Sequence, residues 1–566
     1  MIKLPIRRLA CVLVFLVFQV MSQVCLGQKN LDITEHGAIG NGLTDNTETL
    51  AALMQQVQAG DTLYVPKGQF VLKTLRLKSD VHISGPGLLI QGLEKTEEYT
   101  NAKQNSSAPL LHGNEVNDIY ISVRTISQHE SIGLIECQNI RIDNSKLQGD
   151  STKLRSFSGI LLFNSHNIHI SHTEISHFGT ARKSPKSYQP GTGIRILSSN
   201  GVKISDATIH RNGENGVFMH GSRNVEINRS YFRHNGMSGI QVAFGSTGIE
   251  KNYKFSENTM EFNAADAIDI NNRSPKNALD INCYILNNTS LQNGYVQGES
   301  TPDGSGIATL INVSGVTMRD NTARKNNRPA IYLESCGQIK AISNEADNQL
   351  EITKGLEDLY LHGNTFGNIT FIADVKAKKI KLEENNVNNL HLPNGITIDS
   401  LILTRNQIRN AALNFNLIGN VILKENKISS QAENVAIWIV KGTSFLLEKN
   451  EIESFKSTAV FVRKMATEVR LLHNQIRSAD SCITEDGSNN LLVKGNSLTS
   501  LPGGKTRYTM FSTNPQGLHM ISNEHTGVWW RPALVLKGEG DATLTGEKIL
   551  VGRQKFGQVN VTQSAQ

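Results

Sequence analysis

The chain has 566 residues, of which 38% are hydrophobic and 19% are charged. This composition is too apolar for a disordered chain and too polar for a protein with many membrane spans. The formal net charge of +6 is close to neutral for this length. Composition therefore gives no support for a nucleic-acid-binding protein.

Residues 1–27 have the features of a secretory signal peptide. Three basic residues come first, an apolar run covers 9–20, and small residues at Cys25 and Gly27 precede a cleavage site. The run is shorter than the roughly 20 residues of a membrane-spanning helix. We therefore expect an exported protein, secreted, periplasmic or at the cell surface, with no membrane span after cleavage.

A short motif that starts with Gly or Ala and continues with alternating apolar residues recurs at intervals of roughly 20 to 40 residues. Its first seven copies begin at Gly159, Gly193, Gly216, Gly239, Ala267, Gly306 and Ala330. Two further short alternating segments follow the motif within a copy, as in 224–228 and 230–235. Alternation with period two is typical of strands with one face inward.

One such unit cannot bury its inner face alone, so successive units must stack. The sequence therefore predicts an all-β fold, a right-handed parallel β-helix. We expect an N-terminal cap and first coils over 28–100, the β-helix body over 101–515 and a short β-type C-terminal cap over 516–566. A helix over 44–58, starting at Thr44 or Asp45, would cover the open first turn.

Asparagines recur at the predicted turns, where they tolerate the left-handed backbone region and can form hydrogen-bonded ladders. We expect a structural role for Asn144, Asn228, Asn258, Asn321, Asn364, Asn406, Asn426, Asn450, Asn474 and Asn496.

The four cysteines outside the signal segment are far apart and have no zinc-site spacing. We expect buried hydrophobic residues at Cys137, Cys283, Cys336 and Cys482.

The segment His36-Gly37-Ala38, together with 40–47 and 60–70, resembles the opening of the pectate-lyase superfamily. That superfamily includes polygalacturonases, polysaccharide lyases and phage tailspikes, and the resemblance implies a β-helix. The polygalacturonase strings Asn-Thr-Asp, Asp-Asp, Gly-His-Gly and Arg-Ile-Lys do not occur here. The lyase pattern is matched only in part by Arg273-Ser274-Pro275, because Ala278 stands where a second Arg would be. The resemblance therefore specifies the fold and leaves the activity open.

In the first strand of each copy, the residues between inward apolar side chains should point outward and stack in rows. The predicted rows contain Leu161 and Phe163, Arg195 and Leu197, Phe218 and His220, Gln241 and Ala243, Asp269 and Asn271, Ala308 and Leu310, and Tyr332 and Glu334. Two polar loops, 183–191 and 297–305, would lie beside these rows. Together they predict a groove for an extended polymer.

The pair Asp266 and Asp269 is the sharpest chemical candidate in this groove. Two nearby carboxylates can act as acid and base, or as acid and nucleophile, in glycoside cleavage. His220 would act as a base or orient the sugar. The predicted substrate-binding residues are Arg195, Phe218, Gln241, Asn271, Arg273, Arg328, Tyr332 and Glu334.

These residues predict a carbohydrate-active enzyme that cleaves glycosidic bonds of a polysaccharide or oligosaccharide, with hydrolysis preferred to β-elimination. The hydrolase needs no cofactor; the lyase would use Ca²⁺, with Asp266, Asp269 and Asn271 as oxygen ligands. The alternative is a non-catalytic glycan-binding or cell-surface β-helix. We expect a monomer in either case.

Overall fold

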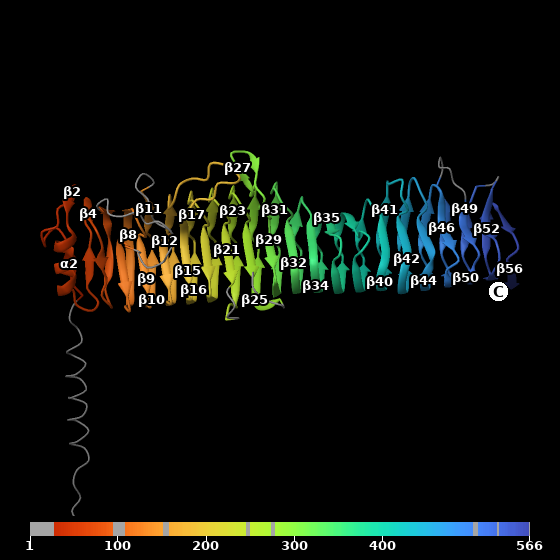
Figure 1. The fold of residues 1–566 in the computed structure, drawn as a ribbon, viewed down its shortest axis with the longest axis horizontal. Coiled ribbons are helices and arrows are strands. Elements are labelled where there is room, and N and C mark those ends of the chain that lie inside the picture. The colour runs from red at the N-terminus through yellow and green to blue at the C-terminus, as the bar shows by residue number, and fades with distance from the viewer. Residues whose placement is uncertain are drawn as a thin grey trace, which may run out of the picture.

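The computed structural model describes residues 28–93, 108–150, 158–244, 249–272, 278–501, 508–528 and 531–564. The predicted signal segment lies outside them. The strands stack in parallel into a solenoid of about 20 turns, which appears as a straight rod in Figure 1. The structure confirms the predicted parallel β-helix.

Each turn of the coil contributes one strand to each of three parallel sheets. In the first sheet, the strands that matter below are β12 (Ser158–Phe163), β15 (Thr192–Leu197), β18 (Val217–His220), β21 (Ile240–Phe244), β24 (Ile268–Asn272), β29 (Ala308–Ile311), β32 (Ile331–Ile342) and β34 (Leu350–His362). In β32 and in β34, one long strand runs through both the first and the second sheet.

The second sheet includes β10 (Gln138–Asp143), β13 (His166–Ser171), β16 (Asn200–Ser205), β19 (Arg223–Asn228), β22 (Tyr253–Ser256), β25 (Leu279–Leu286), β30 (Val313–Arg319), β36 (Lys376–Glu383) and β38 (Thr397–Thr404). The third includes β14 (Glu174–Ser176), β17 (Thr208–His210), β20 (Tyr231–Arg233), β23 (Thr259–Glu261) and β26 (Thr289–Leu291).

The core is the interior of the coil. Period-two alternation sends every second side chain inward, so Ile194, Ile196, Val217 and Met219 are completely buried. The same pattern continues turn after turn, and stacked apolar rows replace the single compact core of a globular domain.

The helix at the amino end is shorter than predicted. α2 covers Thr47–Gln56 and buries Leu50, Leu53 and Met54. Residues 41–45 form strand β2 (Asn41–Asp45) instead of a first helical turn. The Asn46 side chain explains this difference, because it bonds to the backbone of Ile39 and thereby ties the helix start to the preceding turn.

The expected β-type segment at the carboxyl end continues the coil. β50 (Gln516–Ile521), β53 (Asp541–Thr545) and β56 (Asn560–Ser564) pair in parallel, one turn after another.

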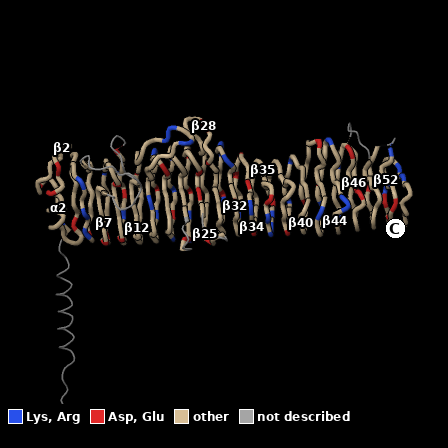
Figure 2. The backbone as a smooth tube through the Cα atoms, in the orientation of Figure 1, with Lys and Arg blue, Asp and Glu red and all other residues tan. Residues whose placement is uncertain are grey.

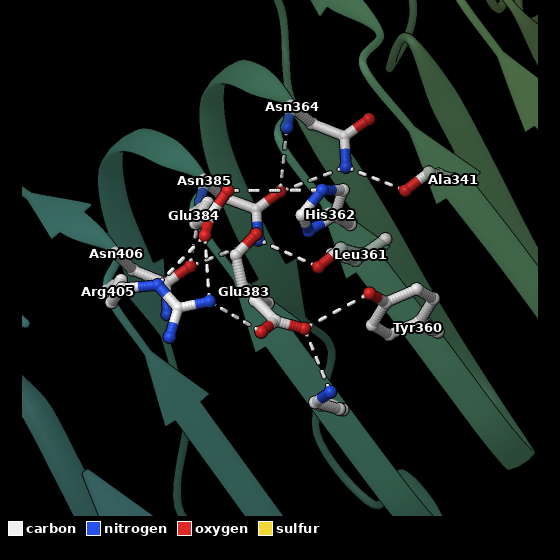
Figure 3. Close-up of polar contacts among 11 residues, drawn as sticks. Ala341, Tyr360, Leu361, His362, Asn364, Glu383, Glu384, Asn385, Arg405 and Asn406 are labelled. Carbon is white, nitrogen blue, oxygen red and sulfur yellow. Dashed lines mark hydrogen bonds and ion pairs between the residues drawn. The ribbon is translucent and has the colours of Figure 1, made fainter. Parts of the chain in front are cut away.

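A buried ladder of asparagine side chains runs along the rod, with one asparagine from the equivalent position of each successive coil. In Figure 3, each asparagine side chain donates to the side-chain oxygen of the next, as Asn364 does to Asn385 at 2.9 Å and Asn385 to Asn406 at 3.0 Å. The ladder contains Asn258, Asn288, Asn321, Asn344, Asn364, Asn385, Asn406, Asn426, Asn450, Asn474, Asn496 and Asn523. Asn144 and Asn228 are not part of the ladder, because Ser145 and Ser230 take the equivalent positions in the early turns. Asn144 does adopt the predicted left-handed backbone, with φ of 51°.

A second buried ladder fixes the turn that leads into the first sheet. It connects Asn212, Asn235, Asn263, Asn293 and Asn326 through side-chain hydrogen bonds of 2.9 to 3.0 Å. Asn263 lies three residues before Asp266, so the ladder fixes the backbone from which the Asp266 side chain extends.

Two long loops extend from the same edge of the coil. Residues 177–191 contain no strand, whereas the second loop contains the antiparallel hairpin of β27 (Tyr295–Val296) and β28 (Glu299–Ser300), which projects from the rod in Figure 1. The Tyr188 hydroxyl donates to Asp303 Oδ2 at 3.4 Å, so the two loops contact each other. The two loops therefore lie side by side.

The four cysteines are free and buried, as expected. Within the described part of the chain, no helix is long and apolar enough to cross a membrane.

Candidate active site

The first sheet brings the predicted site residues into two adjacent rows. Arg195, Phe218, Gln241 and Asp269 occupy equivalent positions on consecutive strands, followed by Thr309 and Tyr332. The neighbouring row contains Leu197, His220, Ala243, Asn271, Ile311 and Glu334. Arg195, His220, Asp269 and Glu334 therefore belong to one sheet, as the sequence predicted.

The predicted register was wrong in one strand. Ala308 and Leu310 are completely buried, and Thr309 and Ile311 occupy the outward rows in their place. The Gly306 motif was aligned one residue out of register, and a slip of one residue exchanges the two faces of a strand.

Asp269 belongs to a chain of hydrogen-bonded amides. Gln241 Nε2 donates to Asp269 Oδ2 at 2.8 Å, and Asn215 Nδ2 donates to Gln241 Oε1 at 2.8 Å. The backbone N–H of Ser238 donates to Asn215 Oδ1 at 3.0 Å and fixes the start of the chain. Asp269 is only 9% exposed, so this network determines the direction of its carboxylate.

Asp266 lies in the turn just before β24 and is 6% exposed. Its Oδ1 accepts from the backbone N–H groups of Gly304 at 3.1 Å and Ser305 at 2.6 Å, and from Thr309 Oγ1 at 3.0 Å. Burial raises the pKa of Asp266 more than these hydrogen bonds lower it. Among the described residues, Oδ2 takes no hydrogen bond, so this oxygen is available to hold a proton.

Arg195 is held at the amino-terminal end of the rows. Its Nη2 lies 3.1 Å from Glu214 Oε2, which also accepts from Thr192 Oγ1 at 2.7 Å. The guanidinium lies over the Phe218 ring, with its carbon 5.3 Å from the ring centroid. Phe218 is therefore already engaged by a cation of the protein.

At the other end of the rows, the Tyr332 hydroxyl donates to Glu334 Oε2 at 2.8 Å, and Lys354 pairs with Glu334. Burial alone would raise the pKa of Glu334, but hydrogen bonds from Lys354 and Tyr332 outweigh it and lower the pKa. Glu334 is thus a paired carboxylate.

The remaining predicted site residues are His220, Asn271, Arg328 and Arg273. His220 is exposed and Asn271 is half-buried in the second row. Arg328 is exposed in the turn before β32, where its backbone N–H donates to the Gly304 carbonyl at 3.2 Å. Arg273 lies outside the described residues.

Sequence reasoning missed three polar residues of this site: Glu214, Asn215 and Thr309. The inter-turn hydrogen bonds place Asn215, Ser238 and Asp266 at equivalent positions before successive strands. Alignment of the turns as well as the strands would therefore have found Asn215, whereas Thr309 was hidden by the register slip.

Two of the predicted Ca²⁺-ligating oxygens already accept hydrogen bonds. Asp266 Oδ1 faces three hydrogen-bond donors, and Asp269 Oδ2 faces the Gln241 amide. A cation would have to displace these donors, because they carry positive charge toward the same oxygens. No group of three or more His, Cys, Asp or Glu residues that could hold a metal occurs in the described ranges.

Residues 103–253 match the model of a family described as a right-handed beta helix region. The chain is 23% identical over 338 residues to an exo-poly-α-D-galacturonosidase of Dickeya chrysanthemi, which covers 54% of this chain and 53% of the relative. The chain thus spans about half the length of the curated relative it matches.

Two solved structures that are similar to this chain belong to different kinds of protein, an enzyme and an adhesin. The first is a hyperthermoactive exopolygalacturonase from Thermotoga maritima, 13% identical with a TM-score of 0.34 over 70% of this chain and 91% of the other. The second is PfbA, a surface adhesin of Streptococcus pneumoniae, 14% identical with a TM-score of 0.34 over 84% of this chain and 93% of the other. The chain contains a right-handed β-helix region and folds as a parallel β-helix throughout its described residues.

Proposed function

We propose that the protein is a glycoside hydrolase that cleaves a polysaccharide or oligosaccharide on the first sheet. The observation that carries this proposal is the difference between two neighbouring carboxyl groups. Asp266 is buried with a raised pKa and a free Oδ2 among the described contacts, while Asp269 is oriented by Gln241. The similarity to an exo-poly-α-D-galacturonosidase supports a glycan substrate.

In this mechanism, Asp266 is the general acid. Its Oδ2 gives a proton to the glycosidic oxygen as the bond to the anomeric carbon breaks. Asp269 has the second role: its carboxylate either takes a proton from the attacking water or attacks the anomeric carbon itself. Arg195 would attract an acidic sugar at the amino-terminal end of the rows.

The test is incubation of the purified mature protein with a panel of plant, algal and bacterial glycans. New reducing ends without an unsaturated product support hydrolysis. Unsaturated uronate ends would contradict it in favour of β-elimination, and binding without products would contradict it in favour of a non-catalytic glycan-binding protein.

Variants then test the two carboxyl groups. Asp266→Asn and Asp269→Asn should each lower turnover about 10²- to 10⁴-fold, since that is the usual contribution of general acid–base catalysis. Asp358→Asn, in β34, is the matched control and should keep full activity. Unchanged turnover in both site variants, with circular dichroism equal to that of the wild type, would reject the assignment.

We also propose export after removal of residues 1–27. Mass spectrometry of protein recovered outside the cytoplasm should find an amino terminus at Gln28. An intact amino terminus at Met1 would contradict this proposal.

A further inference from the structure

A polar cavity lies on the second sheet, apart from the candidate active site. It has a volume of about 360 Å³ and is lined by polar side chains from β10, β13, β16 and β19, together with Arg229 from the turn after β19. Its cationic side chains are Arg141, Lys203 and Arg229, and His169 lies among them. Figure 2 shows acidic and basic residues mixed along the rod, so this grouping of cations is local.

The register explains how the cavity gathers these groups. Arg141, His169 and Lys203 occupy equivalent outward positions on three consecutive strands. Parallel stacking places successive positions about 4.8 Å apart. The three side chains therefore form a short basic row along the rod. Glu226 continues this row on the next strand, and Glu226 and Arg229 also line the cavity.

The nearby carboxylates already have partners. Asp143 lies 3.2 Å from Arg141 Nη2, Asp206 lies 2.9 Å from Arg229 Nη2, and Glu226 accepts from Lys254 at 2.9 Å. Lys203 forms no ion pair with any residue that the structure describes. The cavity therefore has one cation more than the carboxylates around it. Glu226, the carboxylate next to Lys203 in the row, already has Lys254 as its ion-pair partner.

The positive charge of this cavity affects the pKa of His169. Burial lowers the pKa of this imidazole, and the charges of Lys203 and Arg141 lower it further. Both cations therefore act on the ring, and the same charges would attract a bound anion.

We propose that this cavity binds an oxyanion of an acidic glycan, a sulfate ester or a uronate carboxylate. Lys203 is the point charge that the anion meets, and the Arg141 and Arg229 guanidiniums supply further N–H donors. A regular polymer suits the site because its charges can follow the rungs of the coil. This proposal does not rest on the proposed hydrolase, which uses another sheet.

Binding can be measured by isothermal titration calorimetry with the full-length mature protein. The probes are inorganic sulfate, a sulfated oligosaccharide and an oligogalacturonate. We expect binding of at least one oligosaccharide, and the better of the two identifies the anion. Lys203→Gln removes one charge-assisted contact, so the binding affinity of the oligosaccharide should fall about tenfold. Binding should also weaken as salt rises.

Lys340→Gln is the matched control. Lys340 is exposed and lies in the same row of the second sheet, five rungs beyond Lys203. This variant should bind like the wild type. Three results would overturn the proposal: no binding of any probe, equal binding by Lys203→Gln and the wild type, or equal weakening in both lysine variants. Thermal melting of each variant checks that it is folded.

Discussion

Asp266, in the turns from β15 to β32, and Glu383, in the turns from β34 to β38, lie on coils with the same apolar interior, but the two carboxyl groups are neutralised differently. In the earlier turns, Asp266 is surrounded by N–H and hydroxyl donors, and its pKa is raised. In the later turns, Glu383 lies between Lys381 at 2.8 Å and Arg405 at 2.8 Å, as Figure 3 shows in part. The hydrogen bond from Lys381 is the main reason that its pKa is lowered.

This comparison separates two uses of one scaffold. A carboxylate with fixed cations stays ionised and stabilises the surface modestly. A buried carboxyl group without such cations can keep a proton, which is a property of catalytic acids. The longer turns of the earlier region supply the burial, since Gly304 and Ser305 belong to the hairpin-containing loop.

The largest effect should come from breaking the ladder of the later region. Asn385→Ala removes the bonds to the Leu361 carbonyl at 2.9 Å and to Asn406 Oδ1 at 3.0 Å. It also removes Asn385 Oδ1, which accepts from the side-chain amide and the backbone N–H of Asn364. Unsatisfied buried groups should cost about 3 kcal/mol. Hydrogen–deuterium exchange of β36 and β38 measures this loss locally.

Asn388→Ala is the control for that experiment, because Asn388 is exposed and bonds to Asn368 outside the ladder. Its exchange should match that of the wild type. If Asn385→Ala exchanged equally slowly, the ladder would have no measurable role in stability.

The next effect concerns the protonation of the proposed acid. Thr309 donates to Asp266 and thereby lowers its pKa, so Thr309→Val should raise that pKa. Because the acid works in its protonated form, the alkaline limb of kcat/KM should move to higher pH. The pH–rate profile checks this, with Thr317→Val on the second sheet as control. An alkaline limb that moved to lower pH would exclude Asp266 as the acid.

A smaller effect should appear at Glu485, an inward residue of β46 (Ser481–Asp486) that bonds to Ser488 and Ser512. Burial raises its pKa despite these bonds. The folded state therefore holds the proton more tightly than the unfolded state, and stability falls as pH rises from about 4.5 through the folded pKa.

Glu485→Gln removes this titration. Its urea midpoint should exceed that of the wild type at pH 7, and the difference should shrink as pH falls toward 4. A variant less stable than the wild type at pH 7 would contradict the raised pKa.

The smallest effect should come from the ion pairs of Figure 3. Arg405→Gln removes contacts to Glu383 and Glu384, but the Arg405 side chain is 45% exposed. Solvent screening limits the loss of unfolding free energy to less than about 1 kcal/mol. Urea denaturation in low and high salt measures it, and a loss as large as that of Asn385→Ala would erase the proposed contrast between ladder and surface pairs.

Much of the site followed from the sequence because alternation and repeat spacing determine which residues share a row. Arg195, Gln241 and Asp269 were placed correctly in this way. The same logic failed at Thr309, where a long loop shifted the alignment by one residue and thus reversed the faces of β29.

The sequence by itself determined the coil, because period-two alternation in short segments cannot bury its apolar face except by stacking. Only the tertiary structure decided the states of the carboxyl groups. The donors to Asp266 lie 38 to 43 residues away in the chain. Among the described residues Lys203 forms no ion pair, because the nearby carboxylates pair with cations of other positions. Local patterns repeat along a chain, whereas burial and charge pairing depend on contacts between turns.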